Sequence, residues 1–236
     1  MVKVKICGIT NWTDARGAVE AGADFLGFNF YRQSSRYIAP AAARRIVQRL
    51  PPNVASVGVF VNEAEPEMLA IARSVGLDYV QLHGEETPAV VSRMRRTVRV
   101  IKAIRVHGSF RAAQLANFKR ASSILLDGFD ARLRGGTGKS FNWKLAKSAG
   151  RKRQIFLAGG LTPENAAEAV FAARPFAIDV CSGVESRPGK KDAARMRALI
   201  AAVRPVNWTR PVSPVTSSRP VSTKRPVSSA RRKRRS

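Results

Sequence analysis

Residues 2–30 read VKVKICGITNWTDARGAVEAGADFLGFNF. This stretch begins with a short run rich in β-branched residues, continues with a helical pattern at 13–21 and returns to an apolar run at 25–30. Parallel strands need a long crossover, usually a helix, whereas antiparallel strands can be joined by a tight turn. The stretch therefore predicts a strand–helix–strand unit and an α/β fold.

The same alternation recurs along the chain as far as residue 203 and gives eight strand–helix pairs. The expected strands span residues 2–6, 25–30, 55–61, 79–82, 98–104, 123–127, 154–158 and 176–180. The expected helices span residues 13–21, 41–50, 66–74, 88–96, 109–118, 143–148, 163–173 and 190–203. Two helices begin with a threonine followed by proline, at Thr87-Pro88 and Thr162-Pro163, which is typical of helix N-termini.

Eight such units within residues 1–204 predict a (β/α)8 TIM barrel that forms a single domain, slightly smaller than the typical size of about 250 residues. A doubly wound open sheet is the alternative. Such sheets rarely need eight units, and the first strand here lacks the glycine-rich turn that binds dinucleotides. In a TIM barrel the chemistry takes place just after the C-terminal ends of the strands, so the candidate residues are sought there.

The chain is strongly basic, with 42 Lys and Arg against 16 Asp and Glu and a net charge of +26. Nine of the cations and none of the acids lie in residues 205–236, so residues 1–204 carry a net charge of +17. The terminal segment repeats Arg-Pro-Val-Ser from Arg210, Arg219 and Arg225, a pattern that predicts a disordered tail. Positive charge favours anionic partners such as phosphorylated metabolites, nucleic acid or membrane surfaces. The tail is expected either to make unspecific contact with polyanions or to be an inert extension.

Several classes of protein do not fit the composition. Cys7 and Cys181 form no disulfide framework, and with His83 and His107 they give no zinc spacing, so no metal site is expected. Lysines interrupt the apolar N-terminal stretch, unlike a signal peptide. No apolar run reaches the length of about 18 residues needed to span a membrane. We therefore expect a cytoplasmic protein without a membrane partner.

The first strand offers a candidate base or nucleophile. Its alternation places Lys3, Lys5 and Cys7 on one face. If that face points into the barrel, Cys7 lies at the mouth with Lys5 beneath it. A positive neighbour lowers the pKa of a thiol from its usual value of about 8.5. Alternatively, Cys7 is a small buried hydrophobic residue.

Three other strands end with or carry ionisable residues. Asp127 ends the strand 123–127 and is either a general acid or base or a residue that turns the chain. His83 follows the strand 79–82, where it either orients the site or caps the strand. Asp179 faces inward on the last strand, and barrel closure places that strand beside the first. An ion pair between Asp179 and Lys5 is therefore expected.

Two glycine-containing loops are typical of a phosphate site. Gly159-Gly160 follows the seventh strand and Ser182-Gly183 follows the eighth, and these two loops often bind phosphate in TIM barrels. The GGTGKS sequence at 135–140 is not a nucleotide-binding P-loop, because Leu133 stands where that motif needs glycine. Arg36, after the second strand, is either a bidentate ligand for a substrate carboxylate or a solvated surface arginine.

Seven blocks of the sequence, in register, resemble the phosphoribosylanthranilate isomerase family. They are KICGIT at 5–10, GF at 27–28 with SRYI at 35–38, VGVFVN at 57–62, VQLHG at 80–84, LD at 126–127, GGTGK at 135–139 and DVCSGVE at 179–185. The resemblance extends over residues 2 to about 203 and leaves out the tail. It implies a TIM barrel and a step of tryptophan biosynthesis.

The reaction implied is the Amadori rearrangement of N-(5'-phosphoribosyl)anthranilate to 1-(2-carboxyphenylamino)-1-deoxyribulose 5-phosphate. By the same resemblance, Asp127 is the general acid that opens the furanose ring and Cys7 is the general base that removes the C2' proton. Arg36 holds the anthranilate carboxylate, and the two glycine-containing loops hold the phosphate. Lys5, His83 and Asp179 support the site. The reaction needs no metal and no cofactor, and the enzyme is expected to be a monomer or homodimer.

Two alternatives remain at the level of sequence. The related isomerase of histidine biosynthesis carries out the same rearrangement on another substrate, but it has an aspartate where Cys7 stands. A barrel of this kind, catalytically inactive or active, could also bind nucleic acid through its basic surface and tail, electrostatically and without sequence specificity.

Overall fold

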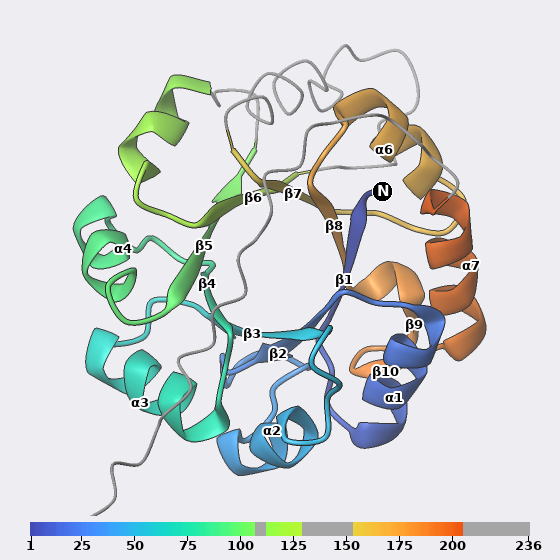
Figure 1. The fold of residues 1–236 in the computed structure, drawn as a ribbon, viewed down its shortest axis with the longest axis horizontal. Coiled ribbons are helices and arrows are strands. Elements are labelled where there is room, and N and C mark those ends of the chain that lie inside the picture. Colours follow the sequence, from blue (N-terminus) through green and yellow to red (C-terminus); the bar gives the residue numbers. More distant parts are fainter. Residues whose placement is uncertain (107–111, 129–152, 205–236) are drawn as a thin grey trace, which may run out of the picture.

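The eight expected strands pair in parallel and close into a barrel, in the order β1 to β8, in this computed structural model (Figure 1). The structure describes residues 1–106, 112–128 and 153–204. The strands are β1 (Lys3–Cys7), β2 (Phe25–Asn29), β3 (Ala55–Phe60), β4 (Tyr79–Leu82), β5 (Arg99–Arg105), β6 (Ser123–Asp127), β7 (Ile155–Ala158) and β8 (Ala177–Val180). Each begins and ends within one residue of its expected range. This confirms the TIM barrel and excludes the open sheet.

Helices surround the barrel on the outside (Figure 1). They are α1 (Trp12–Ala21), α2 (Pro40–Val47), α3 (Glu65–Val75), α4 (Pro88–Met94), the 3-10 helix η1 (Ala112–Phe118), α6 (Ala166–Ala173) and α7 (Ala193–Val203). The predicted start of α4 is confirmed: the Thr87 side chain accepts a hydrogen bond from the Val90 amide, and Pro88 is the first helical residue. The helix expected at 143–148 lies outside the described residues. Within the described ranges, no helix is long and apolar enough to cross a membrane.

Four helix predictions were wrong in part. The helix expected over 41–50 ends at Val47. Residues 112–118 form a 3-10 helix, and Arg153 binds the carbonyl oxygens of Leu115 and Phe118 near its end. The helix expected from 163 begins at Ala166, because Asn165 bonds back to the Thr162 amide and holds the preceding residues in a turn.

The helix expected from residue 190 begins instead at Ala193, where Asp192 is the cap. Lys190–Lys191 form a short strand, β10, paired antiparallel with β9 (Glu185–Arg187). The carboxylate of Asp14 accepts bonds from the Lys190 ammonium and the Lys191 amide. These contacts fix the backbone of the hairpin beside the start of α1.

The barrel interior changes from apolar to polar toward the carboxyl ends of the strands. Inward-facing apolar residues form one cluster: Phe25, Val57, Tyr79, Ile101, Ala103, Leu125, Phe156, Ala158 and Ala177. Lys5 lies in register with Phe25 on one side and with Asp179 on the other. The next inward pair toward the mouth is Cys7 with Gly27. The apolar cluster thus closes the barrel below a layer of ionisable side chains.

Candidate active site

Lys5 and Asp179 form the expected ion pair beneath the barrel mouth. Lys5 Nζ lies 2.8 Å from Asp179 Oδ2, and the Lys5 side chain has no exposed surface. Burial lowers the pKa of Lys5, but the charges of Asp179 and Cys7 outweigh it and hold this pKa above its usual range. Burial raises the pKa of Asp179 to about 6, against the attraction of Lys5. At neutral pH both groups are ionised, so a positive charge lies under Cys7.

Two thiols lie side by side at the mouth. Ile6 pairs with Val180, so Cys7 and Cys181 are the next residues on adjacent strands. A hydrogen bond with Cys181 lowers the pKa of the Cys7 thiol well below its usual value; burial opposes this effect and the charge of Lys5 adds to it. The same contact raises the pKa of Cys181. Cys7 is therefore the thiol that ionises, as a base or nucleophile requires.

Cys181 was not among the site residues expected from the sequence. Its inward parity with Asp179, on the strand that closes against the first, was the signal that could have identified it.

Replacing Cys181 tests this contact. Cys181→Ala should raise the pKa of the Cys7 thiol, whereas Cys181→Ser, which keeps a hydroxyl donor, should raise it less. Since only the thiolate is alkylated, the alkylation of Cys7 in the alanine variant should reach its half-maximal rate at higher pH. The measurement is the iodoacetamide reaction of Cys7 as a function of pH, followed by peptide mass spectrometry. Identical profiles for the parent and the alanine variant would show that Cys181 does not stabilise the thiolate.

Asp127 lies at the end of β6 in contact with His83. His83 Nε2 is 3.2 Å from Asp127 Oδ2, and the amide nitrogen of Gln81 is 2.9 Å from His83 Nδ1. Because the Gln81 amide donates to Nδ1, a neutral His83 carries its proton on Nε2, facing Asp127. The hydrogen bond from His83 lowers the pKa of Asp127, partly offset by burial. This contact favours the orienting role of His83 over a strand cap.

Arg36 is held by a carboxylate. Its Nε and Nη2 atoms lie 2.9 Å and 2.6 Å from the two carboxylate oxygens of Glu185. The stem of Arg36 crosses Gly8, since a β-carbon on this glycine would lie 2.9 Å from Arg36 Cδ. Arg36 therefore lies beside Cys7 and is not a freely solvated arginine. Glu185 was not among the site residues expected from the sequence, although this residue ends the DVCSGVE block.

The two loops expected to bind phosphate touch each other. Gly159 and Gly160 both have positive φ, of 97° and 58°. A β-carbon on Gly183 would collide with the carbonyl oxygen of Leu161, so this close approach requires glycine. Asn165 Nδ2 donates to the Gly160 carbonyl at 2.9 Å and fixes the first loop. The second loop begins with Ser182 in a short 3-10 turn, η3 (Ser182–Val184).

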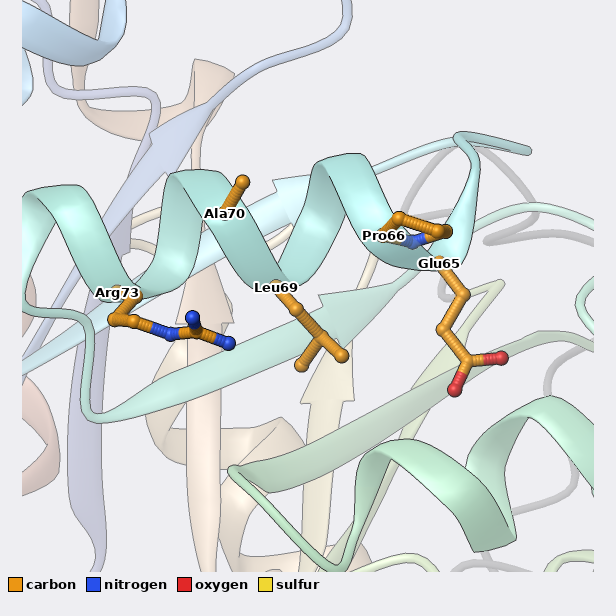
Figure 2. Close-up of a pocket in the computed structure, with 5 residues that line it drawn as sticks. All are labelled: Glu65, Pro66, Leu69, Ala70 and Arg73. Carbon is orange, nitrogen blue, oxygen red and sulfur yellow. The ribbon is translucent and has the colours of Figure 1, made fainter.

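A surface pocket of about 400 Å³ lies elsewhere, on the outer side of α3. It is lined by Glu65, Pro66, Leu69, Ala70 and Arg73 (Figure 2). The carboxylate that lines this pocket, that of Glu65, already forms an ion pair with Arg93 of α4 at 2.8 Å. None of these residues belongs to the cluster at the barrel mouth.

A closed (β/α)8 barrel with ionisable side chains gathered at the carboxyl ends of its strands is the arrangement of TIM-barrel enzymes. Within that class, the family model described as N-(5'phosphoribosyl)anthranilate (PRA) isomerase matches residues 4–202. The chain belongs to the N-(5'-phosphoribosyl)anthranilate isomerase family.

Relatives of this family resemble the chain over nearly their whole length. N-(5'-phosphoribosyl)anthranilate isomerase of Trichlorobacter lovleyi is 52% identical over 201 residues, which cover 85% of this chain and 97% of the relative. The enzyme of Citrifermentans bemidjiense is 51% identical over 206 residues, 87% of this chain and 98% of the relative.

Solved structures show the same barrel. Phosphoribosyl anthranilate isomerase from Thermotoga maritima has a TM-score of 0.79 and 46% identity, over 87% of this chain and all (100%) of that one. A second structure, a complex with reduced 1-(o-carboxyphenylamino)-1-deoxyribulose 5-phosphate, has a TM-score of 0.78 and 44% identity over the same shares, 87% and 100%. The family is thus the one that the sequence blocks predicted, and the histidine-pathway and non-enzymatic alternatives are set aside.

Proposed function

We propose that this chain catalyses the Amadori rearrangement of N-(5'-phosphoribosyl)anthranilate to 1-(2-carboxyphenylamino)-1-deoxyribulose 5-phosphate, a step of tryptophan biosynthesis. The observation that carries the proposal is the placement of a thiol with a lowered pKa on β1 and a carboxyl group on β6, at the same end of one barrel. Strands β7 and β8 separate them. The reaction protonates one atom of the sugar and removes a proton from another, so it needs such an acid and base. Turnover of the substrate by the purified chain is the test.

Asp127 acts first, as the general acid. It protonates the furanose ring oxygen, and the ring opens to a Schiff base between C1' and the anthranilate nitrogen. The side chain of Asp127 is 33% exposed in the free protein. A bound substrate would cover this surface, and loss of water raises the pKa of a carboxyl group. Binding thus moves Asp127 toward the protonated form that the step needs, while His83 keeps the group oriented.

Cys7 acts second, as the general base. The thiolate removes the proton from C2'. The electrons of the C2'–H bond form a C1'=C2' double bond, and the electrons of the C1'=N double bond move to the nitrogen, which gives the enolamine. The enolamine tautomerises to the ketone. The buried charge of Lys5 stabilises the thiolate before the step. Asp179 stabilises Lys5 in turn, so we assign both residues of this ion pair a supporting role.

The two ends of the substrate have separate sites in this proposal. Backbone amides of the Gly159-Gly160 and Ser182-Gly183 loops would bind the phosphate, because glycine lets the backbone approach closely. Arg36 would bind the anthranilate carboxylate through two parallel hydrogen bonds. A complex of one relative with the reduced product supports a phosphorylated substrate.

Arg36→Lys should raise KM by about tenfold, the equivalent of roughly one hydrogen bond to a charged group. Lysine keeps the charge but lacks the planar pair of donors. Steady-state kinetics with N-(5'-phosphoribosyl)anthranilate measures the effect. Arg32→Lys is the matched control, because Arg32 lies in the same loop, exposed and over the Tyr37 ring at 5.7 Å. An unchanged KM in Arg36→Lys, or an equal rise in both variants, would remove Arg36 from the substrate site.

We further propose that residues 1–204 form the catalytic domain and that residues 205–236 contact polyanions without contributing to catalysis. Arg204 supports this boundary: it donates to the Gly22 carbonyl and lies 3.3 Å from Asp24 Oδ2, which joins the end of α7 to the start of β2. The nine cations beyond it can replace counterions on a polyanion. The expected disorder of this tail concerns residues outside the described ranges.

Truncation after Arg204 should leave the melting temperature and kcat/KM unchanged and should weaken retention on heparin without abolishing it. Residual retention follows from the net charge of +17 in residues 1–204. Loss of folding or turnover would show that the boundary is wrong. Unchanged retention would assign polyanion binding to the barrel.

A further inference from the structure

Glu185 is a buried carboxylate shared by two cations beside the site. Its side chain is 4% exposed, that of Lys191 is fully covered at 0%, and that of Arg36 is 25% exposed. Arg36 Nη2 lies 2.6 Å from Oε2, and Lys191 Nζ lies 2.8 Å from Oε1. The two cations and one carboxylate leave one positive charge, which an incoming anion can neutralise.

We infer that Glu185 is a positioning residue: it binds one edge of the Arg36 guanidinium and thereby turns the other edge toward the substrate's aromatic carboxylate. This inference rests on the proposed function. A guanidinium offers two edges with paired donors, Nε with Nη2 and Nη1 with Nη2. Glu185 occupies the first edge. Among the described residues, no hydrogen bond occupies the second edge, and the bonds of the first edge fix its direction.

The hairpin formed by β9 and β10 keeps Glu185 in place. Glu185 begins β9 and Lys191 ends β10. Asp14 accepts from Lys190 Nζ and from the Lys191 amide, both at 2.8 Å. Thr10 donates its hydroxyl to the Gly189 carbonyl at 2.7 Å. These bonds tie the hairpin to Thr10, between β1 and α1, and to Asp14 in the first turn of α1, so the hairpin that carries Glu185 is attached to the segment that follows Cys7.

Lys191 prevents Arg36 from being the sole counterion of Glu185. The Lys191 ammonium group also lies 3.2 Å from the Cys181 carbonyl oxygen. Burial raises the pKa of Glu185, but hydrogen bonds from Arg36 and Lys191 outweigh it and keep this pKa below its usual value. Glu185 is therefore held in its ionised form by these two cations in the free protein. The guanidinium stays oriented in the free enzyme, which lowers the entropic cost of binding.

Glu185→Gln is the test variant, because it keeps the shape and removes the charge. We expect KM for N-(5'-phosphoribosyl)anthranilate to rise about tenfold, as for loss of an oriented charged hydrogen bond, with a smaller change in kcat. For N-(5'-phosphoribosyl)aniline, which lacks the carboxylate, KM should be the same in variant and parent. Glu185→Asp keeps the charge but is one methylene shorter. It should also raise KM, and it provides the test if the glutamine variant does not fold.

A double-mutant cycle with Arg36→Met distinguishes positioning from a general structural role. If Glu185 acts through Arg36, then Glu185→Gln in the Arg36→Met background should change KM less than twofold, because residues acting as one unit are not additive. Glu86→Gln is the control: Glu86 is 4% exposed and pairs with the buried Lys102 at 2.7 Å. This variant should lower the melting temperature without raising KM.

The possible outcomes distinguish the positioning role of Glu185 from the carboxylate-binding role of Arg36. A high KM for Arg36→Met together with an unchanged KM for both Glu185 variants would overturn the positioning role alone. Additive effects in the cycle, or an equal effect on the aniline substrate, would overturn it as well. An unchanged KM for Arg36→Met would overturn the carboxylate-binding role of Arg36, on which this inference rests.

Discussion

Asp127→Asn is expected to lower kcat by a factor of about 10² to 10⁴, the contribution of a general acid, while KM changes far less. The asparagine side chain keeps the shape and can still contact His83, but its amide protons are not acidic enough to protonate the ring oxygen. Ring opening is the first step, and no other group takes over that role in the proposed mechanism. Near-normal turnover in this variant would contradict the assignment.

Asp78→Asn is the matched control for this experiment. The Asp78 side chain is 38% exposed, close to the 33% of Asp127. Asp78 precedes β4 and bonds to Ser56 at the start of β3, at the opposite end of the barrel. Its replacement should lower the free energy of unfolding and leave kcat unchanged. If kcat fell by a similar factor in both variants, the loss of activity in Asp127→Asn would come from a damaged structure and not from the loss of the general acid.

Cys7→Ala should also lower kcat by a factor of about 10² to 10⁴, because the base that removes the C2' proton is lost. We expect this loss to be smaller than that of Asp127→Asn, since water can partly replace a base after the ring has opened. Steady-state kinetics of the two variants, side by side, gives the comparison. Bound substrate should also protect Cys7 of the parent from alkylation. Full turnover in Cys7→Ala, or no protection, would contradict the base role.

The barrel could be predicted because its strands are decided by local sequence. Each strand is buried between the barrel interior and the surrounding helices, so it requires a short apolar run rich in β-branched residues. The strand 79–82 and the strand 123–127 were predicted at their observed bounds. The pair of Lys5 with Asp179 could also be predicted, since side-chain parity and barrel closure together determine which residues meet.

The hairpin and the contacts of Arg36 could not be predicted in the same way. Residues 190–192 look like the start of a helix, and the Asp14 carboxylate that keeps them extended lies 176 residues earlier in the sequence. Glu185 lies 149 residues from Arg36. Lys5 and Asp179 are as far apart in the sequence, but both lie on barrel strands, whose parity and closure determine which residues meet. Asp14 lies in α1 and Glu185 in the short strand β9, so no barrel register predicts their partners. The role of Glu185 is therefore an inference from the structure and not from the sequence.

Acid–base catalysis by this chain is measured as turnover of N-(5'-phosphoribosyl)anthranilate by the purified full-length protein, compared with the double variant Cys7→Ala, Asp127→Asn. Nuclear magnetic resonance follows the conversion, because the anomeric C1' signal of the substrate is replaced by a C1' methylene next to a C2' ketone. We expect rapid formation of the ketose by the parent chain and a rate close to the uncatalysed one for the double variant. Failure of the parent to form the ketose, or equal rates for the two proteins, would contradict this expectation.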